Sequence, residues 1–176
     1  MRGDSKARLI SQEIAGPFFV SGAGKMKTEN EKFQEWARGN NDAAIFLATI
    51  FKVSQDADDI ADGDGLDILG VVSGLLMATT VNRFFVAHRE MLSSLLFSSL
   101  ITWAASNKFG KSENQTTRMF GFVCREALEQ IIPVVSMFCG ATVGEAVAVA
   151  EDVHRYYHQE LPQDTFAEWE SEVKHG

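Results

Sequence analysis

The sequence has few of the residues that mark disulfide-linked, zinc-binding or nucleic-acid-binding proteins. Its 176 residues include only two cysteines, Cys124 and Cys139, and their spacing does not match a Cys-x-x-Cys or Cys/His zinc pattern. We interpret them as reduced, buried thiols of a cytosolic protein. The chain has 16 Lys and Arg against 24 Asp and Glu, a net charge of −8. This acidic balance argues against a nucleic-acid partner, which would require a basic surface.

Long apolar runs are also missing. The longest, residues 68–81, falls short of the roughly 20 residues that a membrane-spanning helix requires. The first fifteen residues are polar and lack the apolar stretch of a secretory signal. The sequence therefore predicts a soluble, cytoplasmic protein with no membrane partner.

Proline is scarce, with three residues, and no long stretch alternates between apolar and polar residues as a strand would. Helical periodicity dominates instead, so we expect an all-α bundle of six or seven helices, with residues 1–27 as an N-terminal arm and 28–176 as a single domain. Thr28 with Glu31 and Thr142 with Glu145 are predicted capping boxes. The expected helices are 28–39, 42–61, 66–80, a long helix ending near 106, 115–138 with a kink at Pro133, 142–160 and 164–173.

The segment QDADDIADGDGLD, residues 55–67, holds six aspartates and no Lys or Arg. Asp58 and Asp62 are four residues apart, so they share one side of a helix beside its apolar face, whereas Asp59 points away from the core. Like charges at this spacing repel, and the helix C-terminus disfavours anions. A divalent cation would relieve both effects, and ligands that are all oxygens suit Mg²⁺, Mn²⁺ or Ca²⁺ and not Zn²⁺, of which we expect Mg²⁺ or Mn²⁺. A solvated acidic turn that merely ends the helix is the alternative.

The five residues Asp58-Asp59-Ile60-Ala61-Asp62 match the DDxxD pattern, and the segment resembles that of class I isoprenoid (terpene) synthases. The resemblance implies an isoprenoid-synthase-like helical fold in which Asp58, Asp59 and Asp62 hold Mg²⁺, and the metal grips a prenyl diphosphate. The second metal motif of these enzymes has the form NDxxSxxxE. Its nearest counterpart here begins at Glu151 and retains only Asp152, a possible second metal ligand.

A second resemblance covers most of residues 40–173. The stretches HREMLSSLLFSSLITWAASNKF, TRMFGFVCREALEQIIPVVSMFCGA and AEDVHRYYHQELPQDTFAEWESE are similar to a group of small uncharacterised tailed-phage proteins. This resemblance implies a location in the cytoplasm of an infected bacterial cell, with the virion as the other possibility. It implies no activity.

Two arginines complete the predicted ligand site. Arg118 and Arg125 lie two turns apart on one helix face and could hold a diphosphate bidentately, although an Arg125–Glu129 salt bridge on a wet face is the alternative. Phe51, Trp103 and Asn107 are candidate lining residues of a pocket. On the helix from Val143, the polar residues opposite the apolar face predict a solvated surface: Glu151, His154 and His158. The alternative is a metal site, because Glu151 and His154 have the Glu-x-x-His spacing of di-iron proteins and His154 and His158 are one turn apart.

Three functions fit these patterns. The first is binding or turnover of a diphosphate-bearing ligand at an acidic divalent-metal site. The second is a non-enzymatic phage accessory protein whose acidic surface binds a host or virion protein. The third, a nucleotide pyrophosphohydrolase, requires ExxE followed by ExxD, and Glu126 with Glu129 supplies only the first half. A homodimer that packs through Ser94, Ser98 and Ala105 is a further possibility.

Overall fold

The chain folds as an all-α bundle, as the sequence predicts. The computed structural model describes residues 27–63 and 67–158, apart from the side chains of residues 61 and 62. Residues 1–26 of the predicted arm and the helix expected at 164–173 lie outside this range. Within it the elements are α1 (Glu29–Trp36), α2 (Asn41–Asp62), α3 (Ile68–Leu76), a π-helical turn (Met77–Val81), α4 (Arg83–Gly110), α5 (Gln115–Arg125), a 3₁₀ turn (Glu126–Gln130), α6 (Ile131–Phe138) and α7 (Val143–Tyr157).

Local sequence signals explain most of the helix ends. Both predicted capping boxes form. The Thr28 and Thr142 hydroxyls accept from the backbone N–H of the third residue of their helix, and the carboxylates of Glu31 and Glu145 accept from the backbone N–H of the cap residue. Gly63 ends α2 in the left-handed conformation, at φ 83°. These ends agree with the sequence to within a few residues.

The helix predicted over 115–138 is not continuous. It is divided by the 3₁₀ turn Glu126–Gln130, which precedes Pro133. A proline ring in a helix clashes with the carbonyl four residues earlier, here that of Glu129, and removes one hydrogen bond. The distortion therefore falls before Pro133 and not at it.

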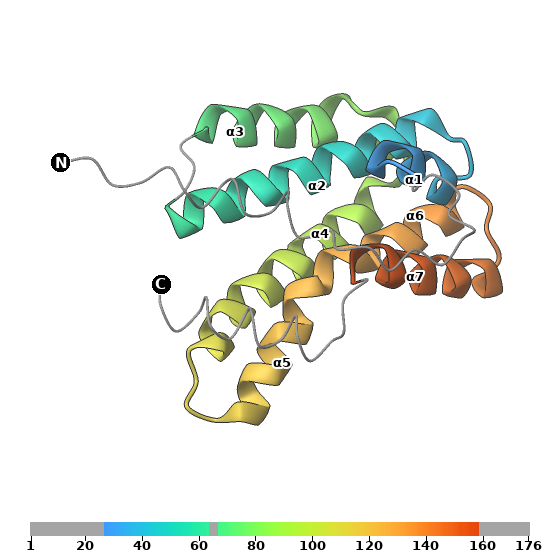
Figure 1. The fold of residues 1–176 in the computed structure, drawn as a ribbon. Coiled ribbons are helices and arrows are strands. Elements are labelled where there is room, and N and C mark those ends of the chain that lie inside the picture. The colour runs from blue at the N-terminus through green and yellow to red at the C-terminus, as the bar shows by residue number, and fades with distance from the viewer. Residues whose placement is uncertain (1–26, 64–66, 159–176) are drawn as a thin grey trace, which may run out of the picture.

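Two helix pairs define the shape of the molecule (Figure 1). One pair is α2 with α3 and the other is α4 with α5, and the pairs diverge from the end at which α1, α6 and α7 lie. Each pair packs closely at a glycine. A Cβ on Gly74 would lie 2.6 Å from Val53, and one on Gly121 would lie 2.8 Å from Phe109, so a larger residue at either position would separate the pair.

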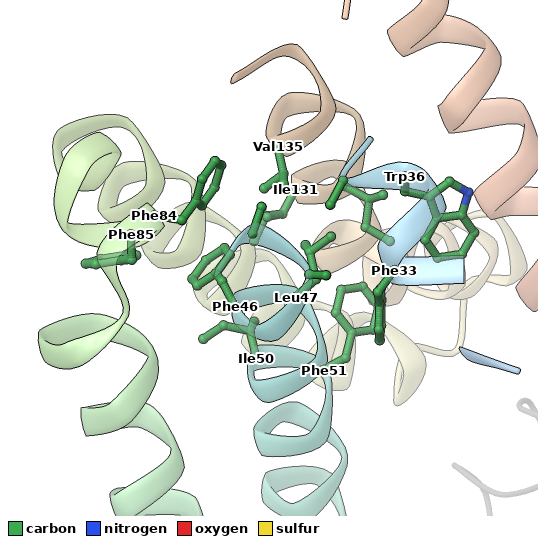
Figure 2. Close-up of a cluster of buried hydrophobic side chains, with 14 of the residues drawn as sticks. Phe33, Trp36, Phe46, Leu47, Ile50, Phe51, Phe84, Phe85, Ile131 and Val135 are labelled. Carbon is green, nitrogen blue, oxygen red and sulfur yellow. The ribbon is translucent and has the colours of Figure 1, made fainter. Parts of the chain in front are cut away.

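The hydrophobic core lies at the end of the bundle at which α1, α6 and α7 meet the two pairs, which we call the closed end. Figure 2 shows side chains from α1, the first half of α2, the start of α4 and α6 meeting there. Phe33, Trp36, Phe46, Leu47 and Ile131 are each no more than 1% exposed. Burial of a side chain of this size contributes roughly 1.5–3 kcal/mol, so this cluster holds the two pairs together.

Asn82 joins the two pairs near that core. Its side-chain amide donates to the carbonyl of Asp42 at the start of α2, 2.8 Å away. Its side-chain oxygen accepts from the Phe85 backbone N–H and caps α4. One side chain thus ties the beginnings of α2 and α4, and the two helices separate beyond it (Figure 1).

The longest helix, α4, is apolar and largely exposed. Arg83–Gly110 is, by length and composition only, long and apolar enough to cross a membrane. Within its most apolar stretch of 18 residues, 17% is buried inside the protein. The absence of a membrane partner therefore stays a prediction.

Candidate functional site

A large groove occupies the space between the diverging helix pairs. It has a volume of about 910 Å³. Its walls are mainly apolar and come from α2, α3, the π-helical turn, α4, the end of α5, the 3₁₀ turn and α7. The lining residues include Phe51, Val53, Ala57, Val71, Leu75, Leu96, Leu100, Trp103, Leu128 and Tyr157. Two of the predicted pocket residues, Phe51 and Trp103, thus line one groove. Asn107, one turn beyond Trp103, is exposed and is not among its lining residues.

An ion pair joins the two walls. Arg125, at the end of α5, donates to Asp58 on α2 over 3.1 Å, and both side chains are about one-third exposed, at 33% and 31%. Both residues line the groove. A pair this accessible to water contributes only about 0–1 kcal/mol to stability, so its charges can be rearranged at small cost when a ligand arrives.

The predicted aspartate cluster is placed unevenly. Asp58 lines the groove, as the helical periodicity predicts for a residue beside the apolar face. The Asp59 side chain is exposed and is not among the lining residues. The side chain of Asp62 lies outside the described residues, so whether it shares a cation with Asp58 stays a prediction.

Arg118 and Arg125 have different surroundings. The Arg118 guanidinium donates to the backbone carbonyls of Ser112 and Glu113, each at 2.9 Å, and so holds the loop between α4 and α5. It does not line the groove, whereas Arg125 does. Of the two arginines predicted to grip a diphosphate, only Arg125 is therefore in the groove.

Asp152 joins two helices. It accepts hydrogen bonds from Lys32 Nζ and Trp36 Nε1 on α1, each at 2.8 Å. Burial opposes ionisation of this carboxyl, but these two donors outweigh burial and hold its pKa below the usual value. Because one carboxylate oxygen accepts both bonds, Asp152 ties α7 to α1, a role that competes with the predicted second metal site.

A further cluster combines two carboxylates and an imidazole beside the groove. His158 Nε2 lies 3.0 Å from Glu129 Oε1 and 3.3 Å from Glu126 Oε2. The side chains of Glu129 and His158 are each 13% exposed. Burial, and then the hydrogen bond and negative charge of Glu126, raise the pKa of Glu129 to about 9.

This cluster was only partly foreseeable from the sequence. The spacing of Glu126 and Glu129 is visible, but His158 was predicted on a solvated face together with Glu151 and His154. The prediction is wrong for His158, which is largely buried, whereas Glu151 and His154 are exposed. His158 is the C-cap of α7, with φ −116° and ψ 56°, so its side chain departs from the helical periodicity.

Tyr157 forms the wall between this cluster and α1. Its hydroxyl donates to Glu29 Oε1 over 2.8 Å, and its ring stacks on Phe51 with centroids 5.8 Å apart. Burial, followed by the hydrogen bond to Glu29, raises its pKa well above the usual range, so this phenol stays neutral. Its contacts with Glu29 and Phe51 tie the end of α7 to α1 and α2.

Comparisons with protein-family models, with curated proteins and with solved structures gave no match. The chemistry of the groove and of its charged side chains therefore provides the basis for a function.

Proposed function

We propose that this chain binds an amphiphilic small molecule in the groove, with an apolar chain along the walls and a diphosphate or similar anionic head at the Asp58–Arg125 end. A divalent cation, Mg²⁺ or Mn²⁺, would accompany the head. The observation that carries the proposal is the 910 Å³ apolar groove bordered by this ion pair.

The size and the walls of the groove suit such a ligand. Small-molecule sites in proteins typically measure about 300–1,000 Å³ and combine apolar walls with a few polar groups that fix orientation. Here Leu75, Leu96, Leu100 and Trp103 supply apolar surface from opposite walls. A hydrocarbon chain that displaced water from these side chains would gain about 25 cal/mol for each Å² of apolar surface buried.

The charged side chains of the groove would favour an anion only if a cation were bound as well. Arg125 and Arg89 are both lining residues and provide two positive charges. Asp58 and Glu126 line the same groove and would repel a diphosphate. A divalent cation on Asp58, with Asp62 one turn further on as its expected second ligand and Asp59 as a third if the helix end opens, would convert this repulsion into attraction.

Binding would exchange partners at the ion pair. The cation would take the Asp58 carboxylate, and Arg125 would turn its guanidinium to the diphosphate oxygens, which it can bind with two parallel hydrogen bonds. If the ligand also reacts, the same cation and arginine would stabilise the charge of a departing diphosphate.

A second candidate function, attachment to another protein, is favoured by a different observation. The α3 helix and the π-helical turn expose an apolar surface that includes Ile68 (61% exposed), Leu69 (77%) and Met77 (57%). Exposed apolar clusters of this kind often mark interaction surfaces. This function would suit a phage accessory protein, but the sequence predicted an acidic binding surface for that role, and this surface is apolar. It also leaves the charged residues in the groove without a role.

The test is thermal unfolding in the presence of an isoprenyl diphosphate and Mg²⁺, with isoprenyl alcohol and inorganic pyrophosphate as partial ligands. A ligand at 100 times its Kd stabilises the native state by about 2.7 kcal/mol, so the complete ligand should raise Tm more than either part. Mg²⁺ should be required for the full shift. Assay of released pyrophosphate in the same samples shows whether the ligand reacts.

Matched variants locate the site. Asp58→Asn and Arg125→Gln should reduce the shift, whereas Glu90→Gln, an exposed acidic residue on α4 outside the groove, should not. An unchanged Tm in wild type, or an equal shift in Asp58→Asn, would rule out this function.

A further inference from the structure

We propose that Glu126, Glu129 and His158 form a site for a divalent transition-metal ion of the zinc type, distinct from the Mg²⁺ expected at the aspartates. All three can offer one ligand atom, and these atoms lie within 4.8 Å of one another. The site joins the 3₁₀ turn to the end of α7.

The local backbone places the two carboxylates on one side. In a 3₁₀ helix the side chains of residues three apart are eclipsed, unlike those of an α-helix, which are offset by about 60°. Glu126 and Glu129 occupy the first and fourth positions of the 3₁₀ turn, so both project in the same direction. Ser99 holds this turn against α4 by donating to the carbonyl of Ala127 over 3.2 Å.

His158 completes the set from another part of the chain. It follows the last residue of α7, and its Nε2 lies between the two carboxylates, 3.3 Å from Glu126 Oε2 and 3.0 Å from Glu129 Oε1. Ligand atoms at about 2.1 Å from a common metal lie roughly 3.0–3.4 Å from one another. Two edges of the required ligand triangle therefore already have the length that a bound metal imposes.

Exposure of the three side chains gives the metal a route in. Glu129 and His158 are 13% exposed, but Glu126 is 33% exposed, and both glutamates line the groove. A metal held by three protein ligands would keep at least one coordination position open, and the groove is where a water molecule or ligand would reach it.

The donor atoms select the metal. An imidazole nitrogen with two carboxylates suits Zn²⁺, Co²⁺ or Fe²⁺ better than Mg²⁺, which prefers oxygen ligands and keeps several waters. Without a metal the same residues form a hydrogen-bonded triad in which His158 Nε2 lies between the carboxyl groups of Glu126 and Glu129. The metal site and the triad differ in what they bind, so a binding experiment separates them.

The test uses Co²⁺ as a spectroscopic probe for Zn²⁺. Full-length chain stripped with chelator should bind one Co²⁺ with a visible d–d absorption band, and one equivalent of Zn²⁺ should abolish that band. A large excess of Mg²⁺ should leave it unchanged. His158→Ala and Glu129→Gln should each weaken Co²⁺ binding at least tenfold.

Matched controls come from the same helix and from the groove. Glu151→Gln alters an exposed carboxylate two turns earlier on α7 and should leave Co²⁺ affinity unchanged. Asp58→Asn should impair the diphosphate effect and leave the Co²⁺ band, so failure of the proposed function and failure of this metal site are distinguishable. Glu126 is the most exposed of the three ligands, so Glu126→Gln is the variant least prone to misfold, and weaker Co²⁺ binding in it would report on the site itself. Far-UV circular dichroism of each variant checks its fold.

The site is overturned if His158→Ala and wild type bind Co²⁺ with the same affinity, because binding would then come from other residues, such as His175 or the aspartates. The absence of a band at one equivalent of Co²⁺ in the folded wild type would show that the cluster is only a hydrogen-bonded triad.

Discussion

The two ends of α2 differ in what surrounds them. In its first half Phe46 and Leu47 are completely buried at the closed end of the bundle, whereas in its second half Val53, Ala57 and Asp58 are partly exposed along the groove. The same contrast separates α6, with four buried residues, from α3, in which none of the described side chains is buried. Stability is therefore concentrated at one end, and surface available to a ligand at the other.

Substitution of a core phenylalanine should show the largest difference between the two ends. Phe46→Ala removes a fully buried ring and should lower the free energy of unfolding by about 3–5 kcal/mol. Phe97→Ala removes a ring that lines the groove and is 65% exposed, and should change it by no more than about 0.5 kcal/mol. Urea unfolding of both variants measures the difference, and equal losses would show that the groove wall is part of the folding core.

The core end was the more predictable from sequence. Helical periodicity identifies which apolar residues of a helix share one face, and it predicted the face that includes Phe46, Leu47 and Ile50. Capping boxes and Gly63 marked the helix ends by local hydrogen bonding and backbone conformation. All of these signals act within a few residues, which is why a single sequence carries them.

The groove was less predictable because it depends on which helices meet. The sequence predicted Phe51 and Trp103 as pocket residues and Asp58 beside the apolar face of its helix. That all three line one groove depends on the divergence of the helix pairs, which no local pattern encodes. The 3₁₀ turn rotates Glu126 and Glu129 relative to an ideal helix, and His158 lies beyond the last turn of α7. Arg125 pairs with Asp58, 67 residues away, and not with Glu129 four residues on as periodicity alone suggested.

The stability of the folded chain should depend on pH through Glu129, which lines the groove. Its pKa is raised from 4.5 to about 9 by burial and by Glu126, while His158 faces it from α7. The native chain therefore holds a proton that the unfolded chain releases above about pH 4.5. This contribution to stability is fully present below pH 4.5 and is lost as pH rises through 9.

In chelator-treated protein, Tm should fall between pH 5 and pH 9. Glu129→Gln should flatten this slope, because the amide has a similar shape and does not ionise. Glu151→Gln, at an exposed position on α7, should keep the wild-type slope. Parallel melting curves for wild type and Glu129→Gln across this range would contradict the assignment.

Filling the groove should separate binding from stability. Ala57→Trp places a large ring among the lining residues and should lower the affinity for an amphiphilic fluorescent anion at least tenfold. Ala104→Trp places the same ring at an exposed position of α4 outside the groove and should leave the affinity unchanged. Fluorescence titration measures both, and unaltered binding in Ala57→Trp would place the ligand elsewhere.

The smallest effect concerns the ion pairs of the closed end. Asp152→Asn removes the charge that binds Lys32 and weakens the bond from Trp36, and should cost about 1–2 kcal/mol because Lys32 is only 15% exposed. Lys27→Met breaks an exposed pair between Lys27, which precedes α1, and Glu35 on α1, and should cost no more than about 0.5 kcal/mol. Urea unfolding distinguishes the two. If Asp152→Asn cost as little as Lys27→Met, or if Mg²⁺ stabilised wild type but not Asp152→Asn, the carboxylate would be a metal ligand more than a tie between α1 and α7.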